Sequence, residues 1–120
     1  MIVERIMKLA KLVFMPEMDE RSLAEARDRG YLSHVFVEID GIQLIPLFFY
    51  DPVRLQQDMQ SEAENGRPFI AYPGMIVIPE VTRQAMQQAI ENLLQEGYFD
   101  YFVPMSREKL ERVNPNQWPP

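Results

Sequence analysis

Hydrophobic and polar positions alternate most clearly over residues 33–50, where two apolar runs flank the dipeptide Asp40-Gly41. Asp-Gly between such runs indicates a β-hairpin, because a type I′ turn needs a positive φ at both central residues. Folding the chain there predicts one core face, formed by the pairs Ile39 with Ile42, Val37 with Leu44, and Val35 with Pro46. The opposite face then carries Glu38 and Gln43 near the turn and Phe36, Ile45 and Leu47 further away, so we expect its far end to be covered.

The N-terminal part of the chain is predicted to be helical. Residues 2–14 place charged and apolar positions on two sides of a helix, although residues 12–14 could instead form a short strand. Pro16 ends this segment. Asp19 is then a good N-cap for a surface helix that runs through Arg29 to Gly30, with Leu23 and Ala26 as a thin apolar stripe.

After the hairpin, Asp51 caps a helix whose first position is Pro52, where the missing N–H costs nothing. Pro46 indicates a bulge or a free edge in strand 42–50, since proline cannot donate to a ladder. The helix ends at residues 65–66, and its predicted core stripe is Leu55, Met59 and Ala63. Residues 69–72 are predicted to form a short strand, residues 73–74 a type II turn and residues 75–78 a buried strand.

The longest predicted helix begins at its N-cap Thr82, with Val81 and Met86 placed as a hydrophobic staple, and ends at Gly97. Six apolar residues define its buried face: Ala85, Met86, Ala89, Ile90, Leu93 and Leu94. Residues 98–103 are predicted to form a last strand and residues 106–113 a short helix. A tail rich in proline and asparagine follows over residues 114–120.

This order of elements predicts a single α+β domain over residues 1–113, followed by the tail. We expect a mixed or antiparallel sheet of about five strands, built around the Asp-Gly hairpin. Three to four helices should pack mainly on one face of that sheet.

Length and composition fit this picture. A chain of 120 residues that is 47% hydrophobic and 25% charged is large enough to build one core without disulfides or structural metal ions. The longest apolar run, residues 44–50, is far shorter than the ~20 residues that a spanning helix needs. With no cysteine and no pattern of a signal peptide, a cytoplasmic location without membrane association is expected.

Charge is spread unevenly along the chain. Residues 30–105 contain ten acidic residues and three arginines, a net charge of −7, whereas residues 1–29 hold six of each sign. Such an acidic body repels nucleic acid and anionic lipid and attracts a basic partner. The same charge could alternatively serve solubility alone.

Candidates for catalysis are few. His34 is the only histidine and there is no cysteine, so neither a His-His pair nor a thiolate set for a metal exists. The carboxylates Asp40 and Asp51 are explained by a turn and a cap. Ser106 and Lys109 match a Ser-x-x-Lys spacing, but the companion motifs of acyl-enzymes are absent. The chain is therefore predicted to be neither an enzyme nor a cofactor-binding protein.

Aromatic residues beside acidic residues are stronger candidates for a functional surface than the catalytic candidates are. Residues 48–50 and 98–102 place rings on both faces of predicted strands, and helices could cover the outer rings. They could alternatively form a contact surface, since interface hot spots favour tyrosine and tryptophan. Asp58 and Glu62 lie four apart on what should be the exposed side of their helix, and Trp118 is either a packed flap or a free recognition element. The predicted partner-binding residues are Tyr50, Asp51, Asp58, Glu62, Tyr98, Asp100, Tyr101 and Trp118.

Two resemblances bear on function. The sequence of residues 45–48 before a helix with Arg54-Leu55, followed by Tyr72-Pro73-Gly74 and a helix from Thr82, resembles the SseB N-terminal type of bacterial accessory domain. In size, acidity and lack of cysteine the chain is similar to immunity proteins of bacterial toxin systems. Both resemblances imply a binding protein.

The leading hypothesis is thus a cytoplasmic bacterial module, not a catalyst, that docks a basic protein through an acidic, aromatic surface, as an immunity protein neutralises a toxin. The alternative is a small enzyme or ligand-binding domain with a pocket formed near Tyr50, Asp51 and His34. Neither hypothesis defines the oligomeric state.

Overall fold

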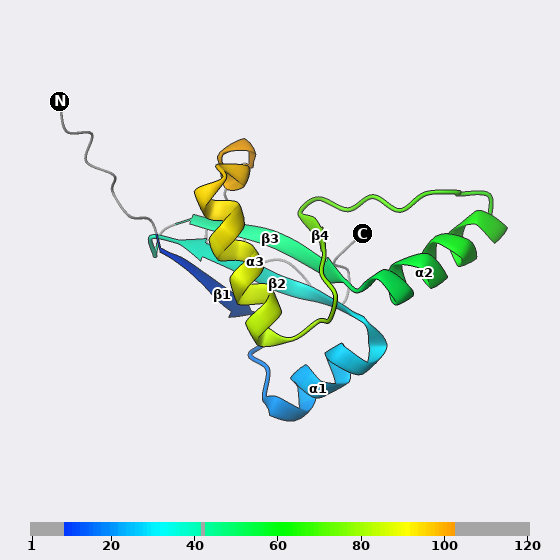
Figure 1. Cartoon of the computed structure of the whole chain (residues 1–120), viewed down its shortest axis with the longest axis horizontal. Helices are drawn as coiled ribbons and strands as arrows, with labels where there is room; N and C mark the ends of the chain where they lie inside the picture. The colour runs from blue at the N-terminus through cyan, green and yellow to red at the C-terminus, as the bar shows by residue number, and fades with distance from the viewer. Residues whose placement is uncertain (1–8, 42, 103–120) are drawn as a thin grey trace.

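The computed structural model describes residues 9–41 and 43–102 and has an α+β fold (Figure 1). Its elements are β1 (Ala10–Phe14), α1 (Glu20–Arg29), β2 (Tyr31–Ile39), β3 (Gln43–Tyr50), α2 (Pro52–Glu64), β4 (Met75–Val77), α3 (Arg83–Gln95) and the 3₁₀ helix η1 (Tyr98–Tyr101). The strands form one mixed sheet in the order β1-β2-β3-β4, with only the β3–β4 pair parallel. The predicted fold class is confirmed, with four strands in the described residues where five were expected.

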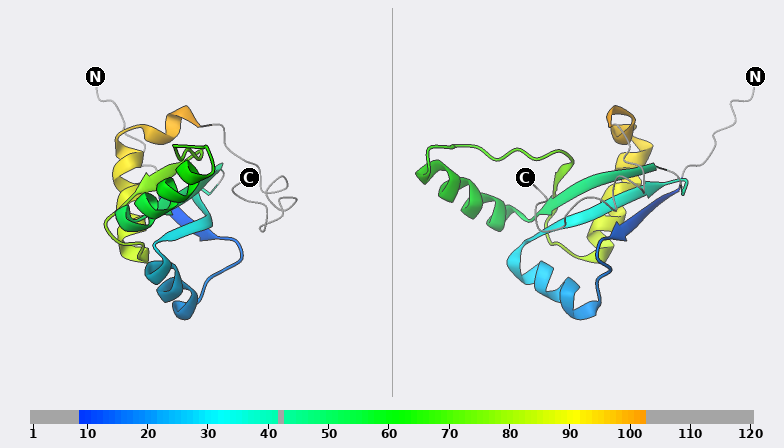
Figure 2. Two further views of the ribbon diagram at one scale, coloured as in Figure 1. Left: turned by 90° about the vertical axis from the view of Figure 1, so that its right-hand side faces the viewer. Right: turned by 180° about the vertical axis from the view of Figure 1, so that it is seen from behind.

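One face of the sheet carries the main core. Helix α3 crosses this face, and the view from behind shows the strands in front of it (Figures 1 and 2). Buried side chains of the three long strands pack there with Leu23 and Ala26 of α1 and with Met86 and Ile90 of α3. A second, smaller cluster on the other face holds Phe36 and Leu44. The helices α1 and α3 therefore share one core on this face.

The hairpin forms where predicted, but its register is shifted. Asp40 and Gly41 both have positive φ, 55° and 72°, as the Asp-Gly pattern requires. Ile39, however, pairs with Gln43 and not with Ile42, so the connection is one residue longer than predicted. A slip of one residue moves every side chain of a strand to the other face. The core residues of β3 are therefore Ile45, Leu47 and Phe49, in place of Leu44 and Pro46.

Pro46 lies at a free edge, one of the two arrangements that its sequence position indicated. The Phe48 N–H donates to the Gly74 oxygen on the β4 side, and the nitrogen of Pro46 faces the same side two residues earlier. Strand β4 begins opposite Phe48, so no ladder bond is lost at the proline.

Helix boundaries agree closely with the capping pattern. The side chains of Asp19, Asp51 and Thr82 each accept a hydrogen bond from a backbone N–H in the first turn of α1, α2 and α3. Gly30 follows α1 in the left-handed conformation. The staple residues Val81 and Met86 are both fully buried. The turn at residues 73–74 also forms, closed by a hydrogen bond from the Met75 N–H to the Tyr72 oxygen.

Three predicted elements are wrong. The helix predicted over residues 2–14 is wrong for residues 10–14, which form β1, and the alternative of a short strand over residues 12–14 is confirmed. Alternation places Leu12 and Phe14 in the core while Lys11 remains exposed. Residues 69–72 lie outside any strand, since β4 occupies the edge of β3 beyond the turn.

The third error is the last strand. Gly97, with a φ of 78°, turns the chain into η1, where Tyr98, Phe99 and Phe102 pack against one another. Strand β4 itself is shorter and less buried than predicted, with Val77 exposed and Ile78 buried just after it. Predictions for residues 2–8, 103 and 106–120 lie outside the described residues.

Candidate protein-binding arm and its anchor

Helix α2 and the segment that follows it, residues 52–74, project from the end of the sheet as an arm (Figure 1). The predicted core stripe on α2 is wrong, because the helix has no buried residue. Leu55 is half-buried, while Met59 and Ala63 are exposed. Large apolar side chains on the arm face solvent, with exposed fractions of 66% for Val53 and 50% for Phe69.

Local interactions give the arm its shape. After α2 ends at Glu64, the Arg67 N–H donates to the Glu62 oxygen and turns the chain back. The Arg67 guanidinium lies 3.8 Å from the Glu62 carboxylate and 4.4 Å from the centre of the Phe69 ring. The returning segment is therefore tied to the C-terminal end of α2.

The base of the arm is fixed by a hydrogen-bonded anchor formed by Tyr50, Arg54 and Asp58. The Tyr50 hydroxyl and the Arg54 Nε each donate to a carboxylate oxygen of Asp58 at 2.8 Å. Arg54 also donates through Nη1 to the Arg29 oxygen at 3.2 Å. Burial and the neighbouring Asp58 carboxylate raise the pKa of Tyr50 well above its usual range, so its hydroxyl stays protonated as a donor.

Aromatic rings support the anchor on the second face of the sheet. Phe48 stacks between Tyr50 and Tyr72, with both ring-centre distances 4.8 Å, and also against Tyr31 at 6.0 Å. The guanidinium groups of Arg29 and Arg54 lie 4.8 and 4.6 Å from the Tyr31 ring centre. Because Tyr72 belongs to the arm, the stack joins both ends of the arm to the sheet. The far end of this face is therefore covered, as expected, but its residues are Phe48 and Tyr50 and not the predicted Ile45 and Leu47.

We expect Asp58→Asn to lower the free energy of unfolding by about 1.5–3 kcal/mol, because two charge-assisted hydrogen bonds are weakened at once. Glu64→Gln makes the same chemical change on an exposed residue of the same helix and should stay within about 0.5 kcal/mol. Urea denaturation of both variants measures the difference. Equal midpoints would show that the anchor contributes nothing.

The predicted partner-binding residues do not form one surface. Tyr50 is buried and Asp58 is half-buried, and both are engaged in the anchor. The prediction that Asp58 lies on the exposed side of its helix is therefore wrong. Asp51 is the N-cap of α2, and Glu62 pairs with Arg67. These four residues lie together on the arm and at its base, but they hold it in shape.

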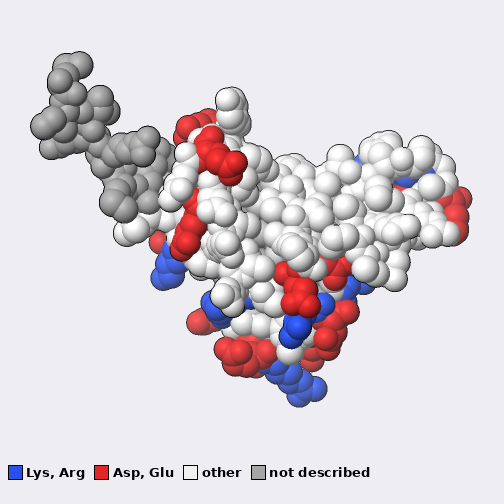
Figure 3. Space-filling model, viewed as in Figure 1, with Lys and Arg blue, Asp and Glu red and all other residues white. Residues whose placement is uncertain are grey.

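Three other predicted residues, Tyr98, Asp100 and Tyr101, lie in η1, away from the arm (Figure 1). Tyr98 is half-buried, and its burial raises the pKa of its hydroxyl. Tyr101 is 90% exposed, beside the exposed carboxylate of Asp100. Acidic side chains gather over η1 and the adjoining part of α3 (Figure 3), where Glu91 and Glu96 are exposed. Trp118 lies outside the described residues.

His34 is separated from the residues predicted to share its pocket. It lines a cavity of about 350 Å³ with residues of the β1–α1 loop, α1 and the start of β2. Neither Tyr50 nor Asp51 belongs to this lining. The predicted pocket of Tyr50, Asp51 and His34 is therefore not formed by the described residues.

Two further properties of the described residues, and the comparisons with known proteins, complete the description of the site. Residues 9–41 and 43–102 contain no cluster of three or more carboxylate or imidazole groups that could hold a metal ion. In the same part of the chain, no helix has the length and apolar character needed to cross a bilayer. Compared with known proteins, the chain matches no family model, no curated protein and no solved structure.

Sequence reasoning singled out Tyr50 and Asp58, but as partner contacts, and it missed Arg54 and the aromatic rings that support the anchor. The spacing of four between Arg54 and Asp58 on a capped helix is a visible signal for an ion pair. Tyr31 and Tyr72 gave no such signal, because their contacts with Phe48 depend on the hairpin register and on the path of the arm.

Proposed function

We propose that this chain is a protein-binding module, not a catalyst, that docks a basic protein through its projecting arm, in the manner of an immunity protein that neutralises a toxin. The observation that carries this proposal is the exposure of α2, which lacks any buried residue. Most helices in proteins are stabilised by packing an apolar face. A helix held clear of the core by a half-buried anchor is suited to packing that face against a partner.

The apolar side chains of the arm provide the contacts. Met59 and Phe69 are large, partly exposed side chains on the two segments of the arm, and Val53 is exposed near its base. The anchor holds the arm in place before binding, which lowers the entropy that association must overcome. The arm thus combines apolar contact area with preorganisation.

The acidic surface of α3 and η1 supports a basic partner. It lies away from the arm, so its contribution is long-range attraction and not contact. Such fields raise association rates and are screened by salt within a Debye length, about 8 Å at 0.15 M. Similarity to immunity proteins in size, acidity and lack of cysteine points the same way.

The test is to capture partners on the immobilised chain from a lysate of the organism that encodes it, and then to measure rates with the purified partner. Met59→Ala together with Phe69→Ala should speed dissociation at least about tenfold, as expected for apolar contacts at the centre of an interface. Gln60→Ala, on the exposed side of the same helix, is the matched control and should change little.

Replacing Glu91 and Glu96 by lysine, which reverses their charge, should change the association rate constant. Association should slow roughly tenfold at low salt and recover as salt rises past about 0.15 M, with dissociation unchanged. A captured protein that binds the arm variant as well as the parent chain would overturn the arm as the docking surface. Failure to capture any basic protein would overturn the function itself.

A further inference from the structure

The second face of the sheet carries an apolar cluster near the hairpin that none of the described helices covers. Phe36 and Leu44 are only 4% and 0% exposed there, and the apolar side chains packed against them are those of Val13 and Met15. The helices α1 and α3 pack on the opposite face, and α2 has no buried residue. The view from behind likewise shows no helix of the described chain across this part of the sheet (Figure 2).

Neighbours within the sheet do not explain why Leu44 is buried. Side chains on one face of a sheet stand roughly perpendicular to it, so adjacent residues flank a side chain and leave its tip open. Leu44 also lies in the part of β3 that β4 does not reach, because β4 pairs only with Phe48–Tyr50. The second face therefore needs a cover that residues 9–41 and 43–102 do not provide.

Exposure across this face falls from β1 to β3. Alternation places Leu9 and Lys11 on the β1 side of the face, and both are exposed, Leu9 by 73%. Leu44, on the β3 side, is fully buried. The cover therefore reaches this face from the β3 side, and not along β1, which residues 1–8 precede.

The chain that follows Phe102 starts on the required side and is long enough. The 3₁₀ helix η1, which ends at Tyr101, lies on the β3 side of the sheet (orange in Figures 1 and 2). Four strands are only about 15 Å wide, whereas the 18 residues 103–120 can span about 60 Å. This C-terminal segment (residues 103–120) contains five large apolar side chains: Val103, Met105, Leu110, Val113 and Trp118.

We propose that the C-terminal segment docks on the second face of the sheet and covers Phe36 and Leu44 with its apolar side chains. Trp118 is the largest of these, and a buried tryptophan removes about 150–250 Å² from water. Trp118 is then a packed flap and not a free recognition element, the two alternatives that its sequence position left open. Docking closes the apolar surface of this face and leaves the arm available to a partner. The inference concerns the chain alone, so it does not rest on the proposed function.

Hydroxyl-radical footprinting of the whole chain measures this cover at single residues. Three large apolar side chains of the C-terminal segment are removed together in the variant Leu110→Ser, Val113→Ser and Trp118→Ser. Labelling of Phe36 and Leu44 should then rise severalfold. Met86 in the main core should stay protected, which shows that the fold is intact.

The matched control changes the other end of the chain. It removes three apolar side chains from residues 1–8 by the changes Ile2→Ser, Ile6→Ser and Met7→Ser. Phe36 and Leu44 should remain protected in this variant. Equal exposure in the two triple variants would overturn the assignment to the C-terminal segment, and full protection in both would overturn the docking.

Trp118 provides a second measurement without any change in the segment, because it is the only tryptophan. Its emission should be blue-shifted relative to N-acetyltryptophanamide, with a severalfold lower constant for quenching by acrylamide. Leu44→Ala should raise that constant, whereas Leu93→Ala, on the opposite face, should not. If Trp118 is quenched like the free indole, or if the two leucine variants behave alike, the inference is overturned even where a triple variant does not fold.

Discussion

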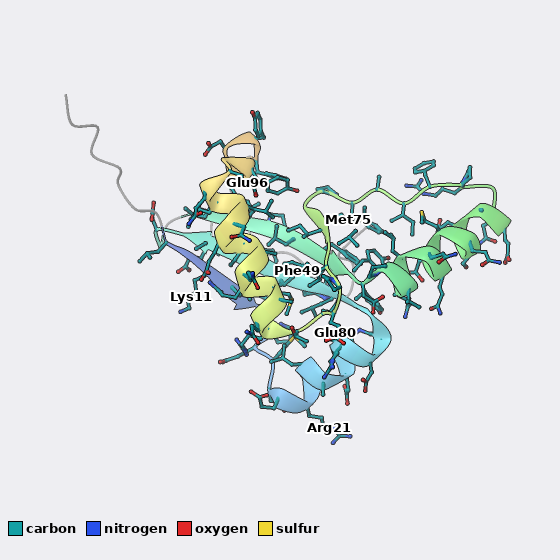
Figure 4. The ribbon with its side chains drawn as sticks, in the orientation of Figure 1. Lys11, Arg21, Phe49, Met75, Glu80 and Glu96 are labelled. Carbon is teal, nitrogen blue, oxygen red and sulfur yellow. The ribbon has the colours of Figure 1, made fainter. Side chains whose placement is uncertain are left out.

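Replacing Phe49 by alanine is expected to lower the free energy of unfolding by about 3–5 kcal/mol, the usual cost of removing a buried phenylalanine ring. Phe49 is fully buried in β3 and belongs to the cluster that joins the sheet to α3. Figure 4 places it near the centre of the molecule. The strand cannot close the space that the ring leaves, because it is hydrogen-bonded to β2 on one side and β4 on the other.

Phe69→Ala is the matched control for this prediction. Its ring is half-exposed on the arm and contacts Arg67, so its loss should cost less than about 1 kcal/mol. Urea denaturation with unchanged m-values compares the two variants. A cost for Phe49→Ala similar to that of Phe69→Ala would mean that the face of β3 assigned to the core is wrong.

Chain reversals and helix ends were predictable because their causes are local. Asp51 with Pro52 at the start of α2, and Thr82 at the start of α3, act within one turn of their own positions. The turn at residues 73–74 likewise needs only a proline followed by a glycine that accepts a positive φ, here 70° at Gly74. Such features do not depend on the rest of the fold.

The register of the hairpin depends on more than its turn. Asp40 accepts a hydrogen bond from the Leu9 N–H on its side chain, and its own N–H donates to the Leu9 oxygen. Leu9 directly precedes β1, so the position of this strand, which the sequence pattern predicted as a helix, contributes to the geometry at the end of β2. A register shift of a single residue then decides which face of β3 enters the core.

The position of the arm could not be predicted from the sequence pattern either. The stripe of Leu55, Met59 and Ala63 is what a core-facing helix would show, and a helix that faces a partner shows the same pattern. The anchor fixes the position of α2 relative to the sheet. It depends on a hydrogen bond between Tyr50 and Asp58, which are eight residues apart in the sequence. The cavity at His34 depends on the bulge in β2, and no residue pattern indicated that bulge.

The second large effect is expected at Gly74, where the arm returns to the sheet. We expect Gly74→Ala to lower the free energy of unfolding by at least about 3 kcal/mol, from two causes that add. Its φ of 70° is strained for any residue with a side chain. The added Cβ would also collide with the Pro46 carbonyl oxygen and lie 3.3 Å from the Leu47 Cα.

Gly66→Ala separates these causes, because Gly66 has a similar φ of 82° and no atom within 4 Å of an added Cβ. It should therefore cost only the backbone term, about 1–2 kcal/mol. The collision at Gly74 cannot be relieved by a side-chain rotation, since both obstructing atoms are backbone atoms of β3. Relief requires β4 to move away from β3, where the Phe48 N–H bonds to the Gly74 oxygen. Gly74→Ala should then also weaken partner binding by the arm, whereas Gly66→Ala should not, and equal losses of stability in the two variants would show that the close packing of β4 on β3 is not essential.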